Sequence, residues 1–180
     1  MAEIIRNGQV VADHWQVLRP TAEVPLAELP AGPVLVPLAV WVERHAELTA
    51  RGDVSIWLAG TDDPAQLTPW LTQLSLVAVD FPKFTDGRGF SVAYLLRSRL
   101  GYRGELRAIG DVLPDQLNYM RRVGFDAFAV RADKDIRKAL QLLQPFSDSY
   151  QGSWDNGSWE KPVPAFRRHT RAWPASGTGN

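Results

Sequence analysis

The chain has 180 residues, of which 45% are hydrophobic and 22% charged; its twenty acids and twenty bases cancel, and it contains no cysteine. This length and composition support a buried core, which excludes disordered, collagen-like and disulfide-framework proteins. The absence of cysteine excludes a cysteine nucleophile, thiol redox chemistry and Cys-ligated zinc or iron–sulfur sites. Any redox role therefore needs an electron carrier supplied by a bound cofactor or by a partner protein.

The first residues predict a β-hairpin, because Asn7-Gly8 is a strong two-residue turn signal between the apolar runs 4–6 and 9–11. No apolar stretch long enough for a signal peptide follows the start. The uncharged run 29–42 contains three prolines and is too short to cross a bilayer. We therefore expect a cytoplasmic protein without a membrane segment.

After a proline-rich segment, apolar β-rich runs alternate with helical patterns. The runs begin 20, 22, 29 and 21 residues apart, at Val34, Val54, Leu76, Glu105 and Asp126. This spacing fits one strand plus one crossover helix and predicts an α/β fold, with a mostly parallel sheet of about five β-α units. Five units are too few for a closed eight-stranded barrel, so an open wound sheet and a partial barrel are both compatible with the pattern.

Local signals set the expected helix bounds. The first helix is expected to end at Gly52, and the second to split into two short pieces at Asp63-Pro64 and Thr68-Pro69. The fifth is expected to begin at an Asp133 cap. The third, over 89–100, is expected to bury one stripe: Val92, Leu95, Leu96 and Leu100.

We expect residues 1–150 to form a single α/β domain, and 151–180 to form an extended tail with a frayed end. The tail interleaves tryptophan with arginine, the side chains most enriched at binding hot spots. It is expected either to pack on its own sheet or to dock a partner through four candidates: Trp154, Trp159, Arg167 and Arg168.

Zero net charge hides an asymmetry, since residues 1–80 hold ten acids and four bases, and residues 81–180 hold ten acids and sixteen bases. Sixteen of the twenty bases are arginine, whose planar fork suits oxyanions. The segment 97–107 contains four arginines, but Glu105 and overall neutrality argue against nucleic acid. We expect a solvated surface there.

The loop FPKFTDGRGFS, residues 81–91, carries the strongest functional signal. Ligands of parallel α/β sheets collect at the carboxyl ends of strands, and this loop combines glycines, two bases and a helix start. Asp80 is expected to orient one of the bases, and the loops after the next two strands are expected at the same edge. The candidate anion-binding residues are Lys83, Asp86, Gly87, Arg88, Gly89, Asp111 and Arg131.

A structural alternative is that Asp86 caps the helix while the two bases are solvated. The loop is not a Walker loop, and no dinucleotide fingerprint follows any strand. The three histidines lie far apart without ligand spacing, so no metal site is expected. The sequence shows no catalytic motif and no signal for an oligomeric state.

The segment 81–130, with its FPKFTDGRG and GDVLPDQ…GFDAF blocks, resembles the bacterial family called domain of unknown function 934. The hairpin and the VPL…W segment near 36–41 are also similar, so that the resemblance covers about residues 1–150. The resemblance implies an oxidoreductase role in sulfite reduction, beside assimilatory sulfite reductase. It supplies no catalytic residues, and it marks the place of a family site at these positions: Asp86, Gly87, Arg88, Gly89, Asp111, Gln116, Gly124 and Asp126.

Three functional hypotheses follow. The first is an accessory protein that assists or docks onto sulfite reductase and binds a small anion at the loop. The second is an oxidoreductase that holds flavin or NAD(P) in a non-standard pocket. The third is an enzyme acting on a phosphorylated metabolite.

Overall fold

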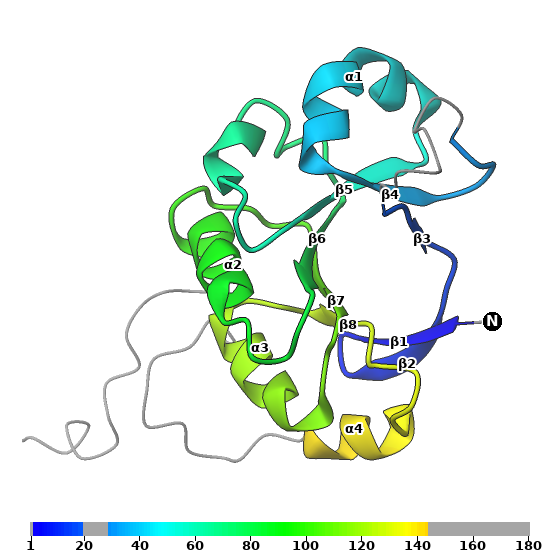
Figure 1. The fold of residues 1–180 in the computed structure, drawn as a ribbon, viewed down its shortest axis with the longest axis vertical. Coiled ribbons are helices and arrows are strands. Elements are labelled where there is room, and N and C mark those ends of the chain that lie inside the picture. Colours follow the sequence, from blue (N-terminus) through cyan, green and yellow to red (C-terminus); the bar gives the residue numbers. More distant parts are fainter. Residues whose placement is uncertain (1, 20–28, 144–180) are drawn as a thin grey trace, which may run out of the picture.

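The computed structural model describes residues 2–19 and 29–143, and it begins with the expected hairpin (Figure 1). Strand β1 (Ala2–Arg6) pairs antiparallel with β2 (Gln9–Asp13). The turn residues Asn7 and Gly8 have φ of 50° and 75°. Positive φ at both central residues is the type I′ turn that Asn-Gly favours, so this prediction is confirmed.

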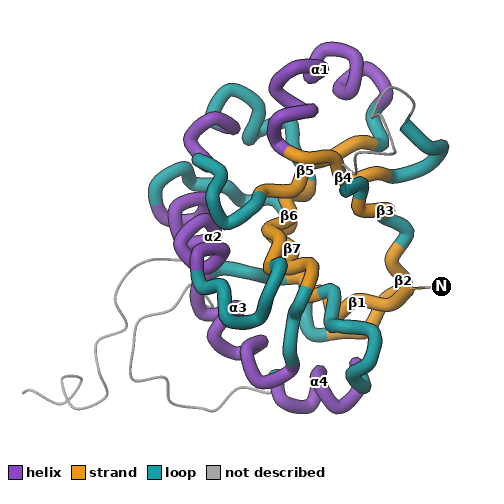
Figure 2. Tube along the Cα trace, in the orientation of Figure 1, coloured by secondary structure: helices purple, strands orange, loops and turns teal. Residues whose placement is uncertain are grey.

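The strands form one sheet in the order β2-β1-β8-β7-β6-β5-β4-β3. Strands β3 to β8 run parallel, and β1 is antiparallel to both of its neighbours. The sheet curls into a half-barrel with the helices outside it (Figures 1 and 2). The six parallel strands are β3 (Gln16–Val17), β4 (Val34–Pro37), β5 (Val54–Leu58), β6 (Leu76–Phe81), β7 (Glu105–Gly110) and β8 (Ala127–Phe128).

The α/β class is confirmed, whereas the description as a mostly parallel sheet of five β-α units is only approximate. The hairpin makes the sheet mixed, and the two-residue β3 adds a parallel strand too short to leave a sequence pattern. Between β5 and β6 the chain forms only turns and the 3₁₀ helix η1 (Pro64–Leu67), because Pro69 interrupts the segment.

The helices outside the sheet are α1 (Leu38–Arg51), α2 (Arg88–Ser98), α3 (Leu117–Val123) and α4 (Ile136–Leu142), with the 3₁₀ helix η2 (Pro114–Gln116) before α3. Helix α1 ends at Gly52 in the left-handed conformation, as predicted. The prediction for α4 was wrong: Asp135, rather than Asp133, accepts the backbone N–H groups of Arg137 and Lys138.

Hydrophobic side chains pack on both faces of the sheet. The larger core fills the space between the sheet and the helices, and a smaller cluster that includes Leu35, Trp57 and Ala78 covers the concave face. Helix α2 buries Val92 and Leu96 as expected, but Leu95 is 38% exposed, and Arg97 is buried as well.

The expectation of a solvated surface over 97–107 was wrong for two of its arginines. Arg97 is 3% exposed and Arg107 is 1% exposed. Their guanidinium hydrogens are taken by carbonyls and the Asp126 carboxylate at Arg97, and by the carboxylates of Asp13 and Glu105 at Arg107.

Gly89 sets how closely α2 approaches the sheet. A Cβ atom there would lie 2.7 Å from two ring atoms of Phe81 and 3.2 Å from Val79. Both side chains are buried, so neither can move aside cheaply. We expect Gly89→Ala to lower the free energy of unfolding by about 1–3 kcal/mol in urea denaturation.

Gly87→Ala is the matched control, because a Cβ atom there meets nothing closer than 3.9 Å and its φ is −77°. It should change stability by less than about 0.5 kcal/mol. Equal effects of the two substitutions would contradict the packing role of Gly89.

Within residues 2–19 and 29–143, no helix has the length and apolar character needed to cross a membrane. The tail candidates Trp154, Trp159, Arg167 and Arg168 lie outside the described residues. Their role stays a prediction.

Candidate functional site at the carboxyl edge of the half-barrel

Three loops meet at the carboxyl ends of β6, β7 and β8, and Asp111 joins them. Its Oδ2 accepts the backbone N–H of Phe84 at 2.9 Å, and its Oδ1 accepts from Nη1 of Arg131 at 2.8 Å. The side chain of Gln116 also donates to the carbonyl of Phe84 at 2.8 Å. The structure therefore brings the 81–91 loop, Asp111 and Arg131 to one edge.

All three guanidinium nitrogens of Arg131 donate hydrogen bonds to carboxylates. Its Nε and Nη2 donate to Asp133 at 2.5 and 2.8 Å, while Nη1 donates to Asp111. The Phe84 N–H and Arg131 together lower the pKa of Asp111. Arg131 thus holds Asp111 in place, and each of its guanidinium nitrogens already donates to a carboxylate.

The two bases of the loop differ in their surroundings. Arg88 donates to Asp86 from Nε at 2.9 Å and from Nη2 at 2.7 Å, which leaves Nη1 without a hydrogen-bond partner in the described chain. The Arg88 side chain is 60% exposed. Lys83 is exposed and makes no ion pair with any described residue.

The two loop glycines differ in their structural roles. Gly87 precedes the first residue of α2 with ordinary negative φ, and Gly89 gives close packing on Phe81. Asp86 lies one residue before the N-cap Gly87, accepts the backbone N–H of Arg88 at 3.2 Å and also orients the Arg88 fork. Of the cationic nitrogens in the candidate set, Nζ of Lys83 and Nη1 of Arg88 are those that make no hydrogen bond within the described chain.

The hydrogen bonds from Arg88 lower the pKa of Asp86 to about 2. Because the carboxyl pKa is lowered, the stabilisation from the Asp86–Arg88 pair is fully present above the ordinary value near pH 4. It is lost as pH falls through about 2. We expect carboxyl-carbon NMR to give a titration midpoint near pH 2 for Asp86. Arg88→Ala should raise the midpoint to roughly 3–4, and Lys83→Ala should leave it unchanged; a wild-type midpoint near 4 would count against the pair.

The sequence did not reveal a cluster on the concave face. Asp80, 5% exposed at the end of β6, was expected to orient a base of the loop, and instead it pairs with Arg19 through two hydrogen bonds of 2.8 and 2.5 Å. The Arg19 guanidinium lies 5.5 Å from the centre of the Trp57 ring, whose Nε1 donates to the Leu18 carbonyl at 2.9 Å. An acid at the end of an otherwise apolar strand is the only signal that the sequence carries for it.

Gly110 gives Asp80 its room. Its φ is 92°, and a Cβ atom there would lie 2.6 Å from Oδ1 of Asp80 and also clash with the Phe81 carbonyl. The carboxyl edge therefore carries arginine–aspartate pairs at Asp80, at Asp86 and at Arg131. Among the described residues, no three histidine, aspartate or glutamate side chains gather in a way that would hold a metal ion.

Comparison with known proteins identifies one family. The sequence profile described as bacterial protein of unknown function (DUF934) matches residues 55–160, which include most of β5, all of β6 to β8 and the whole 81–91 loop. No curated protein matches the chain.

Proposed function

We propose that this chain, which belongs to the family of bacterial proteins of unknown function DUF934, is a cytoplasmic accessory protein of assimilatory sulfite reduction. In this proposal it assists or docks onto sulfite reductase and binds a small oxyanion at the carboxyl edge of its half-barrel. The proposed role in sulfur assimilation rests on what the family resemblance implies. The proposal that the ligand is an oxyanion rests on the geometry of the loop.

One observation carries the oxyanion proposal: the side chains of Lys83 and Arg88 are exposed and lie on one short loop, and Nζ of Lys83 and Nη1 of Arg88 have no partner among the described residues. Asp86 fixes the orientation of the Arg88 fork, and Asp111 anchors the loop between them through the Phe84 N–H. Charge-assisted hydrogen bonds from lysine and arginine are the usual means of binding oxyanions such as sulfite, sulfate and phosphate.

Growth of a deletion strain tests the place in metabolism. We expect poor growth on sulfate and on sulfite as sole sulfur source, and full rescue by sulfide, because sulfide lies after sulfite reduction. Normal growth on all three sources would remove the sulfite-reduction role. Rescue by sulfite would place the protein at an earlier step.

Calorimetric titration with sulfite, sulfate and phosphate tests whether the loop binds an oxyanion. Arg88→Ala and Lys83→Ala should each weaken binding about fivefold or more, since each removes a charged hydrogen-bond donor. Arg137→Ala is the control, because that exposed arginine lies on α4, outside the loop. Unchanged affinity in both loop variants, or no binding by the wild-type protein, would contradict the site while leaving the growth test unaffected.

Purified protein separates the accessory role from the competing oxidoreductase role. A stoichiometric flavin absorbance with NAD(P)H-dependent turnover would overturn the accessory proposal. Capture of sulfite reductase that is lost on deletion of residues 151–180 would support docking through the predicted tail.

A further inference from the structure

Helices α2, α3 and α4 present exposed apolar side chains on the outside of the half-barrel. Tyr94 on α2 is 44% exposed, Tyr119 on α3 is 51% exposed and Leu142 on α4 is 53% exposed. The helices adjoin one another, since the rings of Phe90 and Tyr119 lie 4.8 Å apart and the Asn118 side chain donates to the Leu142 carbonyl at 2.5 Å. Figures 1 and 2 show them in order along one side. We call Tyr94, Tyr119 and Leu142 the helical face, and exposed apolar side chains gathered in this way mark an interaction surface.

The surroundings of the helical face are basic. Helices α2, α3 and α4 contain no aspartate or glutamate, and they carry six cations: Arg88, Arg97, Arg121, Arg122, Arg137 and Lys138. All of these except Arg97 are at least partly exposed. Two copies of a basic face repel each other, so this charge disfavours a dimer through the face and favours an acidic occupant.

The next residues of the chain have the complementary composition. Residues 144–160 contain no lysine, arginine or histidine, and they combine three acids with four aromatic residues: Asp148, Asp155, Glu160, Phe146, Tyr150, Trp154 and Trp159. Residues 161–180 are the reverse, with four lysines or arginines and no acid. The DUF934 profile ends at the same division, since its match continues past α4 as far as residue 160.

The chain reaches residue 144 beside the helical face. Arg121 of α3 donates from Nη1 to the carbonyl of Leu143, the last described residue, at 2.8 Å. Seventeen extended residues span about 55 Å, whereas the eleven residues of α2 are about 17 Å long. Residues 144–160 can therefore cover the whole face.

The sheet is a poorer place for this aromatic segment. On its concave face, Trp57 is 9% exposed, and Leu76 and Ile109 are each 2% exposed. These side chains are already covered, so they offer little apolar area for further burial.

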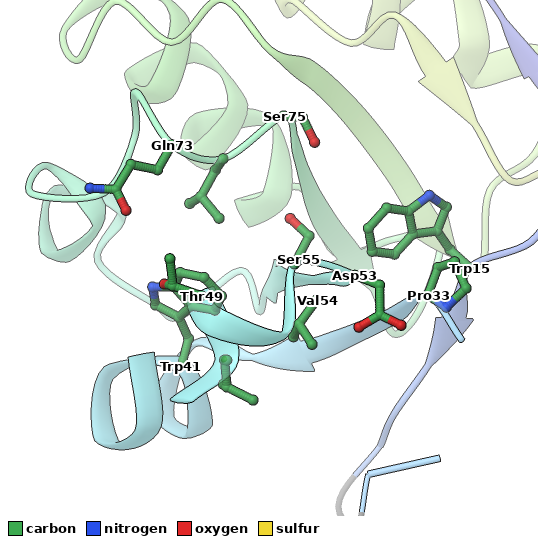
Figure 3. A pocket seen from close by; sticks show the side chains of 12 residues that line it. Trp15, Pro33, Trp41, Thr49, Asp53, Val54, Ser55, Gln73 and Ser75 are labelled. Carbon is green, nitrogen blue, oxygen red and sulfur yellow. The ribbon is translucent and has the colours of Figure 1, made fainter. Parts of the chain in front are cut away.

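A cavity at the amino edge of the half-barrel is also a poorer match. It has a volume of about 330 Å³, and Figure 3 shows Trp41 and Thr49 on one side of it and Trp15 on the other. The ionisable side chain of its lining is Asp53, to which Nε of Arg51 donates at 2.6 Å. An acidic segment would meet a carboxylate there, whereas it meets cations beside the helical face.

We propose that residues 144–160 fold back over the helical face, with their aromatic side chains on Tyr94, Tyr119 and Leu142 and their carboxylates towards the cations of α3 and α4. Of the four tail candidates, Trp154 and Trp159 then belong to the domain, and Arg167 and Arg168 are left for a partner. This inference does not depend on the proposed role in sulfite reduction.

Paramagnetic broadening in NMR of the full chain tests the arrangement. Because the chain contains no cysteine, a nitroxide on Ser153→Cys is attached at a single position. The amide signals of Tyr94, Tyr119 and Leu142 should lose about half of their intensity or more relative to the reduced nitroxide, because a tethered segment acts at high effective concentration. Val42 on α1 is the matched control, since it is apolar and 39% exposed but is followed by Glu43; its signal should keep its intensity.

Two sets of variants test the contacts. Replacing both Tyr119 and Leu142 by serine removes apolar area from the face and should reduce the broadening at Tyr94 about twofold or more. Both side chains are more than half exposed, so the core is left intact. Val42→Ser should leave the broadening unchanged. Lysine at both Asp148 and Asp155 should weaken it as the serine pair does, because the segment loses its charge complementarity.

The same measurements can overturn the proposal. Full signals at Tyr94, Tyr119 and Leu142, equal loss at Val42, or broadening at Trp57 in their place would each contradict it. Unchanged broadening in the serine variant would do so as well. A mixture of nitroxide-labelled chain and unlabelled ¹⁵N chain should show no broadening; broadening there would assign the face to a second copy of the chain.

Discussion

Replacement of Arg97 by methionine is expected to lower the free energy of unfolding by about 3–5 kcal/mol, because it removes a buried charge from four partners. The guanidinium donates to the carbonyls of Tyr102, Gly104 and Gly124 at 2.8, 2.9 and 2.9 Å, and to Asp126 at 2.8 Å. Methionine fills similar space but leaves these acceptors without a donor. Urea denaturation at pH 7 measures the loss.

The Arg97→Met penalty should depend on pH in a defined direction. Burial raises the pKa of Asp126 and lowers that of Arg97. Loss of the Arg97 charge raises the Asp126 pKa further, so the folded variant takes up a proton more readily than the unfolded chain does. Its stability relative to wild type should therefore improve as pH falls from 7 towards 5.

The exposed Arg44–Glu47 pair on α1 provides the control, and Arg44→Ala should have little effect on unfolding. If Arg97→Met unfolds at the same urea concentration as the wild-type protein at pH 7, the four hydrogen bonds do not hold α2 to the β7–β8 side of the sheet.

The sequence predicts those parts of the fold that are encoded by neighbouring residues. Asn7-Gly8 specifies its turn through its own backbone preferences, and Gly52 ends α1 because a left-handed cap needs no distant partner. The starts of β4 to β7 were predicted because buried parallel strands are nearly continuous apolar runs. The short β3 was missed because its two residues pair with β4 without any pattern of their own.

The sequence does not predict which charged residues are buried, because their burial depends on partners far along the chain. Asp80 meets Arg19 across 61 positions, and Arg107 meets Asp13 across 94. An arginine beside other arginines in sequence is more often solvated, and only the tertiary structure shows which one finds a carboxylate.

The candidate site shows the same limit within a single loop. The sequence placed Lys83 and Arg88 at the carboxyl edge, where the structure has them. It did not reveal that two of the three guanidinium nitrogens of Arg88 donate to Asp86, or that all three of Arg131 donate to Asp111 and Asp133. Residue types alone give the composition of a site, and the pairing decides which donors remain open.

The second large effect is expected at Arg107, which joins two distant strands across the concave face of the sheet. Its Nη1 donates to Asp13 at the end of β2, and its Nε donates to Glu105 on β7, both at 2.8 Å. The arginine is 1% exposed, and the side chains of Asp13 and Glu105 are 12% and 18% exposed. The hairpin is therefore tied to β7 by side chains as well as by the ladder through β1 and β8.

Arg107→Met should lower the free energy of unfolding by about 3–5 kcal/mol, because two largely buried carboxylates lose their shared cation. The triple variant with Asp13→Asn and Glu105→Gln as well removes the stranded charges and should recover more than half of that loss. Urea denaturation of both variants separates the cost of unpaired charge from the cost of lost packing. If the triple variant is no more stable than Arg107→Met, the arginine acts through its packing, and the ion pairs themselves contribute little to holding the hairpin on the half-barrel.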